Sequence, residues 1–268
     1  MVKLEKVKKQ YKDFELDCSM EIKEGWITGL VGQNGAGKST AFKAMLGLIR
    51  SDSGKIEILG KTPELLGKEE REQIGVVMAG SGFNGYLSIN DLIPIFDAMY
   101  QKFDKAWFLK ECEKFKLPLK KKIKEFSTGM NRKLQILAAL SHDAKLLILD
   151  EPTAGLDPRG RDTILGEIRE YHEERKNTVL LVSHSMEDIA QYAKKVLVIA
   201  EGKPAMYDTV ENIFSRVEEL TAMGLAVPQI SRVFAGLRAA GYQVPGNIYT
   251  VEGAAAAILN AVKGGAAR

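Results

Sequence analysis

Short apolar runs of the length of buried strands recur along the chain, and helical patterns separate most of them. They occur at residues 74–78, 145–149, 178–182 and 196–200, and a further run at 26–31 comes directly before a glycine-rich segment. Compact apolar runs bounded by turn residues are typical of strands that are buried on both faces, as in a parallel sheet. Short β-rich segments at 3–11 and 14–20 precede the run at 26–31, and another at 55–59 follows it. The pattern therefore predicts an α/β fold in which an antiparallel β layer accompanies a parallel core sheet.

Helical periodicity takes over between residues 89 and 124, where large apolar residues recur every three or four positions. We expect an all-helical insertion into the sheet domain, at about 85–144. After residue 215 the chain becomes Ala-rich, with helical patterns at 227–240 and 251–262 and with 264–268 expected to be frayed. We therefore predict a main domain over 1–215 and a small accessory domain over 216–268.

Composition narrows the class of protein without deciding its function. Of the 268 residues, 45% are hydrophobic and 27% are charged, which is ordinary for a globular protein. No apolar run approaches the roughly 20 residues of a spanning helix, and we expect no signal peptide. The net charge of +3 is too small to indicate nucleic acid as a partner. Cys18 and Cys112 are too few for a disulfide framework, so we expect a reducing compartment.

The glycine-rich segment at 32–40 reads GQNGAGKST and fits the P-loop pattern Gly-x-x-x-x-Gly-Lys-Ser/Thr. A chance glycine-rich turn is disfavoured, because a strand precedes the segment and a helix expected at 41–48 follows it. Backbone N–H groups in such a loop face phosphate oxygens, Lys38 reaches the β and γ phosphates, and the Ser39 hydroxyl binds Mg²⁺. The expected nucleotide-binding residues here are Gly32, Asn34, Gly35, Gly37, Lys38, Ser39 and Thr40.

Two of the apolar strands end in residues that can support phosphate chemistry. Asp150 and Glu151 follow the run at 145–149, and His184 comes two residues after the run at 178–182. Ligands bind at the carboxyl edge of open α/β sheets. We expect Asp150 to bind Mg²⁺, Glu151 to orient or deprotonate an attacking water, and His184 to hydrogen-bond the transferring phosphate. Lys38, Glu151 and His184 are thus the candidate catalytic residues.

A second anion site is expected where Ser127 precedes a helical pattern at about 130–142. Ser127 is a natural N-cap, and the free N–H groups of a helix start attract anions. A capping signal alone would mean little. Its place shortly before the acidic strand is the reason to include it.

Together these segments resemble the ABC ATPases, the nucleotide-binding subunits of ATP-driven transporters. The resemblance covers Walker A (32–40), the signature (127–131), Walker B (146–151), the D-loop (154–157) and His184 as the switch histidine. It implies a P-loop NTPase fold, ATP and Mg²⁺ as cofactors, and hydrolysis of ATP. It further implies a dimer in which Walker A of one subunit and Ser127 and Gly129 of the other enclose each ATP. Tyr11 lies where the family has an aromatic residue that stacks on adenine.

The resemblance also implies a transmembrane transporter subunit as partner and a peripheral position on the cytoplasmic face of the cell membrane. Two departures from the family pattern stand out. The signature reads FSTGMN in place of LSGGQ, although Ser127 and Gly129 are retained, and Ala79 stands where the family has the Q-loop glutamine. The second departure puts in doubt the usual coupling between the membrane partner and Mg²⁺.

The two parts of the chain resemble different branches of the family. Residues 79–149 resemble exporter-type, ABC-2-like ATPases, whereas the chain from Glu151 onward resembles the ATPases of energy-coupling-factor importers. A natural recombinant, a divergent member and an engineered fusion joined near Asp150 are all compatible with this pattern. Neither the transported substrate, nor the direction of transport, nor the choice between homodimer and heterodimer follows from the sequence.

A different class of function is a soluble ABC protein that acts on ribosomes or nucleic acid, or a nucleotide-gated scaffold. The first normally needs two cassettes or long coiled coils, and this chain has one cassette and no heptad run. A scaffold should have lost catalytic groups, yet Lys38, Glu151 and His184 are all present. We therefore expect a transporter ATPase.

Overall fold

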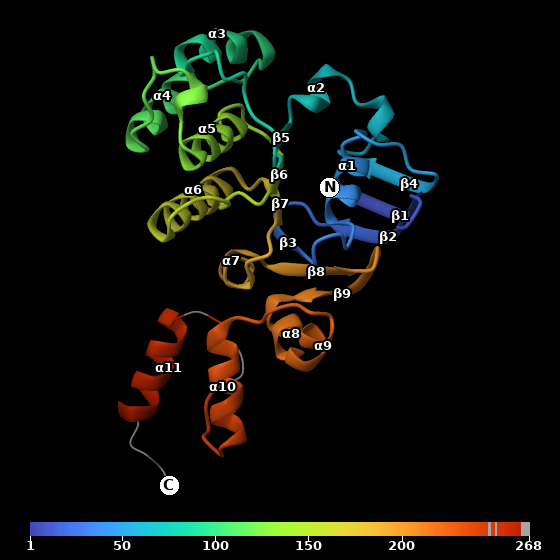
Figure 1. The fold of residues 1–268 in the computed structure, drawn as a ribbon, viewed down its shortest axis with the longest axis vertical. Coiled ribbons are helices and arrows are strands. Elements are labelled where there is room, and N and C mark those ends of the chain that lie inside the picture. Colours follow the sequence, from blue (N-terminus) through green and yellow to red (C-terminus); the bar gives the residue numbers. More distant parts are fainter. Residues whose placement is uncertain (246–247, 250, 264–268) are drawn as a thin grey trace.

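A central sheet organises the fold of this computed structural model, which describes residues 1–245, 248–249 and 251–263 (Figure 1). In the described part of the chain the sheet has six strands in the order β5-β6-β7-β3-β8-β9. They are β5 (Ile74–Val77), β6 (Leu146–Asp150), β7 (Thr178–Val182), β3 (Ile27–Val31), β8 (Lys195–Ala200) and β9 (Lys203–Thr209). The first five run parallel, which confirms the predicted core, whereas β9 is an antiparallel edge strand that the sequence pattern did not predict.

A smaller antiparallel sheet lies beside the central one, as predicted. Its order is β2-β1-β4, from β2 (Glu15–Ile22), β1 (Val2–Gln10) and β4 (Ser53–Ile58). Hydrogen bonds join it to the β8–β9 hairpin: the backbone N–H of Asp17 donates to the carbonyl of Gly202 at 2.8 Å, and the Tyr207 hydroxyl donates to the carbonyl of Glu21 at 2.6 Å. The small sheet thus packs beside the P-loop strand.

Helices lie beside the central sheet and at both ends of the molecule (Figure 1). α3, α4 and α5 gather at one end of the molecule, and α8 to α11 at the other. The helices are α1 (Lys38–Met45), α2 (Lys68–Arg71), α3 (Ile89–Met99), α4 (Lys105–Lys114), α5 (Thr128–Leu140), α6 (Pro158–Arg175), α7 (Met186–Tyr192), α8 (Val210–Ser215), α9 (Val217–Ala222), α10 (Gln229–Ala239) and α11 (Val251–Lys263), with 3₁₀ turns η1 (Pro63–Leu65) and η2 (Ile123–Glu125).

Two helix starts differ from the predicted ones, and capping explains both. α1 begins at Lys38 rather than at residue 41, because Gly37 takes a left-handed φ of 105° and serves as its N-cap. α5 begins at Thr128 rather than at residue 130, because the Ser127 hydroxyl accepts a hydrogen bond from the backbone N–H of Met130 at 3.2 Å. Both shifts place the helix N-terminus among the proposed phosphate-binding residues.

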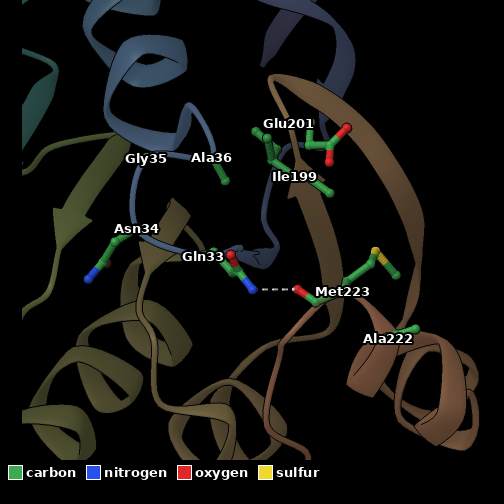
Figure 2. A pocket seen from close by; sticks show the side chains of 9 residues that line it. Gln33, Asn34, Gly35, Ala36, Ile199, Glu201, Ala222 and Met223 are labelled. Carbon is green, nitrogen blue, oxygen red and sulfur yellow. Dashed lines mark hydrogen bonds between the residues drawn. The ribbon is translucent and has the colours of Figure 1, made fainter. Parts of the chain in front are cut away.

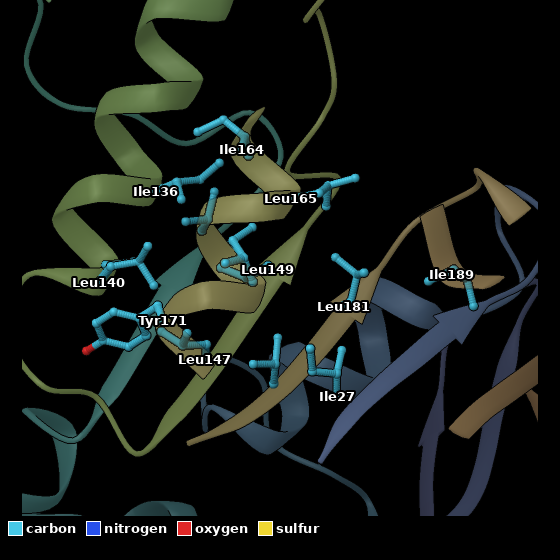
Figure 3. Close-up of a cluster of buried hydrophobic side chains, with 14 of the residues drawn as sticks. Ile27, Ile136, Leu140, Leu147, Leu149, Ile164, Leu165, Tyr171, Leu181 and Ile189 are labelled. Carbon is cyan, nitrogen blue, oxygen red and sulfur yellow. The ribbon is translucent and has the colours of Figure 1, made fainter. Parts of the chain in front are cut away.

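Buried side chains from both faces of the central sheet form the core. Leu147, Leu149 and Leu181 point toward α5 and α6 (Figure 3). Their neighbours Ile148 and Leu180 point to the opposite face, toward α1 and the antiparallel sheet. Because both faces are covered, β3, β6 and β7 are buried along their whole length and are mostly apolar. The chemical groups described below lie at the carboxyl edge of these strands.

The first part of the predicted accessory domain (216–268), called the tail below, is buried in this core. Leu220 on α9 and the following Val227 lie in the same cluster as the sheet strands, as does Phe214 on α8 just before the tail. Farther along, α11 exposes Ile258 and Leu259. Residues 264–268, which were predicted to be frayed, lie outside the described part of the chain. Among the described residues, no helix has the length and apolarity needed to cross a membrane.

Candidate nucleotide-binding site

The P-loop connects β3 to α1, so the buried central strand leads directly into a helix N-terminus. The ammonium of Lys38 folds back onto the loop and donates to the carbonyl oxygens of Gly32 at 2.6 Å and Gln33 at 3.0 Å. Lys38 is only 9% exposed. Burial lowers the pKa of its ammonium, and the nearby carboxylates of Glu151 and Asp150 partly oppose that shift. A cation therefore lies inside the loop, close to both acids.

Close packing explains the glycines at the ends of this loop. A Cβ at Gly32 would lie 2.3 Å from the carbonyl oxygen of Ile199 on β8, and one at Gly37 would lie 2.8 Å from the Phe14 ring. A side chain at either position would force its neighbour to move, since real Cβ contacts are essentially never that short. The loop is thereby held against β8 on one side and the antiparallel sheet on the other.

The acidic residues and the histidine meet at the same edge of the sheet. β6 and β7 are parallel neighbours, and β7 pairs with β3, so Asp150, His184 and the P-loop all follow adjacent carboxyl ends. The carboxylate Oε2 of Glu151 lies 2.7 Å from Nδ1 of His184, whose side chain is 75% exposed. Glu151 itself has a left-handed φ of 50°. Such strained backbone in a non-glycine residue is concentrated at functional sites.

Oxygen donors suited to Mg²⁺ lie on the same edge. Asp150 is buried at the end of β6, and the backbone N–H of Ala79 donates to its Oδ2 at 3.1 Å. Ser39 is exposed in the first turn of α1. A carboxylate and a hydroxyl are hard oxygen ligands of the kind that Mg²⁺ prefers. The residues present therefore fit this ion.

The signature and the adenine candidate lie elsewhere in the chain. The start of α5 packs on the D-loop: a Cβ at Gly129 would lie 3.1 Å from Leu156, and one at Gly155 would lie 2.8 Å from the side chain of Thr128. Ser127 is exposed at this helix start. Tyr11 is 43% exposed in the turn between β1 and β2, its ring 6.3 Å from that of Phe14.

Sequence reasoning missed a contact between the tail and the P-loop. The Gln33 side-chain amide donates to the carbonyl of Met223, just after α9, at 3.0 Å (Figure 2). A cavity of about 530 Å³ lies between the P-loop, the end of β8 and α9. A second cavity, of about 470 Å³, is lined both by His184 and by Gly224–Ala226. The turn after α9 is thus part of the wall around the site, which no local pattern in the sequence indicates.

A second missed group connects α5 to the sheet edge. The Arg132 guanidinium is mostly buried and donates to Oε1 of Gln135 at 3.1 Å, while the Gln135 amide donates to the carbonyl of Ser81 at 2.7 Å. Burial lowers the pKa of Arg132, and Asp150 and Glu151 oppose that shift. The segment after β5, in which Ala79 stands at the position of the Q-loop glutamine, is therefore held by two hydrogen bonds. The carbonyl of Ser81 accepts from Gln135, and the backbone N–H of Ala79 donates to Asp150.

The family model for the ABC transporter matches residues 16–154, which is just over half of the chain. The chain belongs to the ABC transporter ATPase family. Energy-coupling factor transporter ATP-binding protein EcfA2 of Clostridium tetani is 34% identical over 265 residues, covering 91% of this chain and 88% of that protein. Linearmycin resistance ATP-binding protein LnrL of Bacillus subtilis is 33% identical over 244 residues, covering 87% and 77%.

Solved structures confirm the fold. An ATP-binding subunit of an ABC transporter matches with a TM-score of 0.73 and 22% identity, over 89% of this chain and 99% of that one. The ATP-binding cassette MJ0796, a dimer in a post-hydrolysis state bound to ADP and Pi, matches with a TM-score of 0.70 and 22% identity, over 78% and 99%. The predicted P-loop NTPase fold of the ABC ATPases is therefore correct.

Family membership also confirms the predicted class of function, an ATP-binding and hydrolysing transporter ATPase, over the scaffold or ribosome-associated alternative. The relatives include both an energy-coupling factor transporter ATP-binding protein and a linearmycin resistance ATP-binding protein, and each aligns along most of the chain. The comparisons thus do not divide the chain near Asp150, and a mixed origin stays a hypothesis.

Proposed function

We propose that this ATPase binds MgATP at the P-loop edge of its central sheet and pairs with a second ATPase subunit. Hydrolysis of ATP in the pair then drives a separate transmembrane subunit. The observation that supports this most strongly is the contact between Glu151 and His184, at the sheet edge that also carries the P-loop. An acceptor for a proton and an imidazole for a phosphate oxygen are there held beside a phosphate cradle.

The nucleotide is held mainly by the P-loop. Backbone N–H groups from Gly32 to Thr40 surround the phosphates, and the ammonium of Lys38 moves from the loop carbonyls to the β and γ phosphate oxygens. Ser39 and Asp150 would hold Mg²⁺, which would supply positive charge to offset that of the phosphates. Tyr11, exposed in its turn, stacks on the adenine. Asn34, Gly35 and Gly37 shape the loop.

Hydrolysis depends on the Glu151–His184 pair. The Glu151 carboxylate orients the attacking water and accepts its proton. The His184 imidazole hydrogen-bonds a γ phosphate oxygen and, through its contact with Glu151, keeps that carboxylate aimed at the water. Both groups act on the transferring phosphate, so their removal should reduce the rate more than the affinity.

A second subunit completes the site through its signature. Ser127 is exposed at the N-terminus of α5, where free N–H groups favour an anion. We place Ser127 and Gly129 of one subunit on the ATP that is held by Walker A of the other. EcfA2 is named as an ATP-binding protein of energy-coupling factor transporters. By analogy, this chain serves a transmembrane subunit from the cytoplasmic face of the membrane.

We propose that the segment 79–124 determines partner choice and that the accessory domain over 216–268 contributes dimer contacts. The helical segment 79–124 receives the transmembrane subunit, and the tail helices strengthen the pairing of ATPase subunits. Replacing 79–124 by the matching segment of LnrL or EcfA2 should redirect partner choice in pull-downs. Deletion of the tail should begin after Val227, because Leu220 and Val227 are part of the core. A deletion that dimerises normally but loses its partner would overturn this division.

The experiment that tests the proposed function measures ATP hydrolysis by the purified chain, and by a Glu151→Gln variant that preserves the shape of the side chain. Hydrolysis should depend on Mg²⁺ and be lost in the variant, whereas ATP binding should be retained. Affinity purification from membranes should recover a protein with spanning segments. A Glu151→Gln variant that hydrolyses ATP at the parent rate would refute the assigned role.

A further inference from the structure

His184 is exposed, so contacts elsewhere in its loop must keep it beside Glu151. Its side chain is 75% exposed, so packing does not fix it. The loop that carries it lies between β7 and α7, and Ser185 caps α7 by accepting from the backbone N–H of Asp188 at 3.3 Å. The backbone N–H of Ser185 donates to the Ser183 hydroxyl at 3.0 Å. Groups that hold Ser185 therefore hold His184.

We propose that Arg161 and Asp188 are positioning residues that keep the Glu151–His184 pair together and connect it to the D-loop. The inference rests on the proposed function of that pair. The Arg161 guanidinium, on α6, donates through Nη2 to the Ser185 hydroxyl and through Nε to Oδ1 of Asp188, the latter at 2.7 Å. One arginine thus holds both the N-cap of α7 and a buried carboxylate three residues later.

Asp188 connects this arginine to the segment that follows Glu151. It is 5% exposed, and its Oδ2 accepts a hydrogen bond from the Thr153 hydroxyl at 3.1 Å. Thr153 lies two residues after Glu151, and its carbonyl accepts from the backbone N–H of Leu156 in the D-loop. A buried carboxylate is costly unless it is paired and hydrogen-bonded, and here both of its oxygens have donors. Together with the contact between Glu151 and His184, these contacts form a closed ring that passes through the catalytic pair.

The position of Arg161 connects this ring to the D-loop. Arg161 lies in the first turn of α6, directly after the D-loop at 154–157, and Asp157 caps that turn by accepting from the backbone N–H of Gly160 at 3.1 Å. The signature helix packs on the D-loop of the same chain. A displacement of the D-loop would thus move Arg161, and with it the His184 loop.

The test compares Arg161→Ala, Arg161→Lys and Asp188→Asn with Arg159→Ala, which removes an exposed arginine from the same helix turn. Because a displacement of about 1 Å in a catalytic group can cost about 10²-fold, we expect kcat to fall by roughly 10- to 10²-fold in Arg161→Ala and Asp188→Asn. KM and nucleotide affinity should stay within about twofold, and Arg161→Lys should recover part of the rate. Arg159→Ala should behave like the parent.

A spectroscopic measurement separates positioning from a general loss of structure. The chain has three histidines, so their side-chain ¹⁵N resonances can be assigned one by one. In Arg161→Ala the His184 resonances should move toward their values in Glu151→Gln, while those of His142 and His172 stay in place. Unchanged His184 resonances, or an unchanged kcat, would overturn the proposal. Parent-rate hydrolysis by Glu151→Gln would instead refute the proposed function itself.

Discussion

Replacing Lys38 by alanine removes a buried cation from the P-loop, and the structure allows the effect on ATP affinity to be worked out. The ammonium already makes two hydrogen bonds, to the carbonyls of Gly32 and Gln33, and it must exchange these for phosphate oxygens. A hydrogen bond to a charged group contributes about 1.5–3 kcal/mol. The two bonds to neutral carbonyls are exchanged for stronger bonds to charged phosphate oxygens, so we count the net gain on binding as about one such bond. We therefore expect Lys38→Ala to lose about 1.5–3 kcal/mol of binding free energy, or roughly 10- to 10²-fold in Kd.

The assay is a titration with a fluorescent ATP analogue in the presence of Mg²⁺. Lys43→Ala is the matched control, because Lys43 lies on the same helix, α1, but in its last turn. The control should bind nucleotide like the parent. A Lys38→Ala variant whose Kd stays within about twofold of the parent would refute the assignment of this loop as the phosphate site. A uniform weakening in both variants would point to damage to α1 instead.

Three further outcomes follow from the geometry. Glu151→Gln should lower kcat by about 10²- to 10⁴-fold while nucleotide affinity is retained, as measured by phosphate release and titration, and a normal kcat would contradict the general-base role. Gly224→Ala should lower the free energy of unfolding by about 1–3 kcal/mol, measured by urea denaturation, because φ is 66° at this residue and a Cβ would lie 1.8 Å from Nε2 of Gln33. If adding Gln33→Ala restores none of the lost stability, the clash is not its cause. Cys18 and Cys112 are buried, and burial raises the pKa of each thiol to about 12. Thiol reagents at pH 8 should therefore label neither cysteine in the native protein, and rapid labelling would contradict their burial.

The strands that carry chemistry were predictable because both of their faces are buried. β6 and β7 are continuously apolar, so the runs at 145–149 and 178–182 indicated them directly. β9 was missed because it is an edge strand whose residues are mostly half-exposed or exposed, with Met206 as a buried exception. The start of α1 was misplaced by three residues, since the left-handed φ of Gly37 decides it and such backbone geometry is not written in hydrophobic periodicity.

The candidate site shows the same division between local and tertiary information. The P-loop, Asp150 and Glu151 follow strands of the predicted parallel sheet, so their meeting at its carboxyl edge was expected. By contrast, the contacts made by Arg161 with Ser185 and by Gln33 with Met223 connect residues that are 24 and 190 positions apart. Polar contacts of this kind depend on the packed structure and leave no periodic pattern in the sequence.

The central claim, that two subunits close on ATP with the signature of each completing the site of the other, is tested most directly by mass in solution. The Glu151→Gln variant of this 29.6 kDa chain should double its mass by light scattering when MgATP is added. Adding Ser127→Arg, which places a bulky side chain in the proposed interface, should keep the mass at that of one chain while ATP still binds. An ATP-dependent dimer that persists with Ser127→Arg, or a mass that never doubles in Glu151→Gln, would contradict the account.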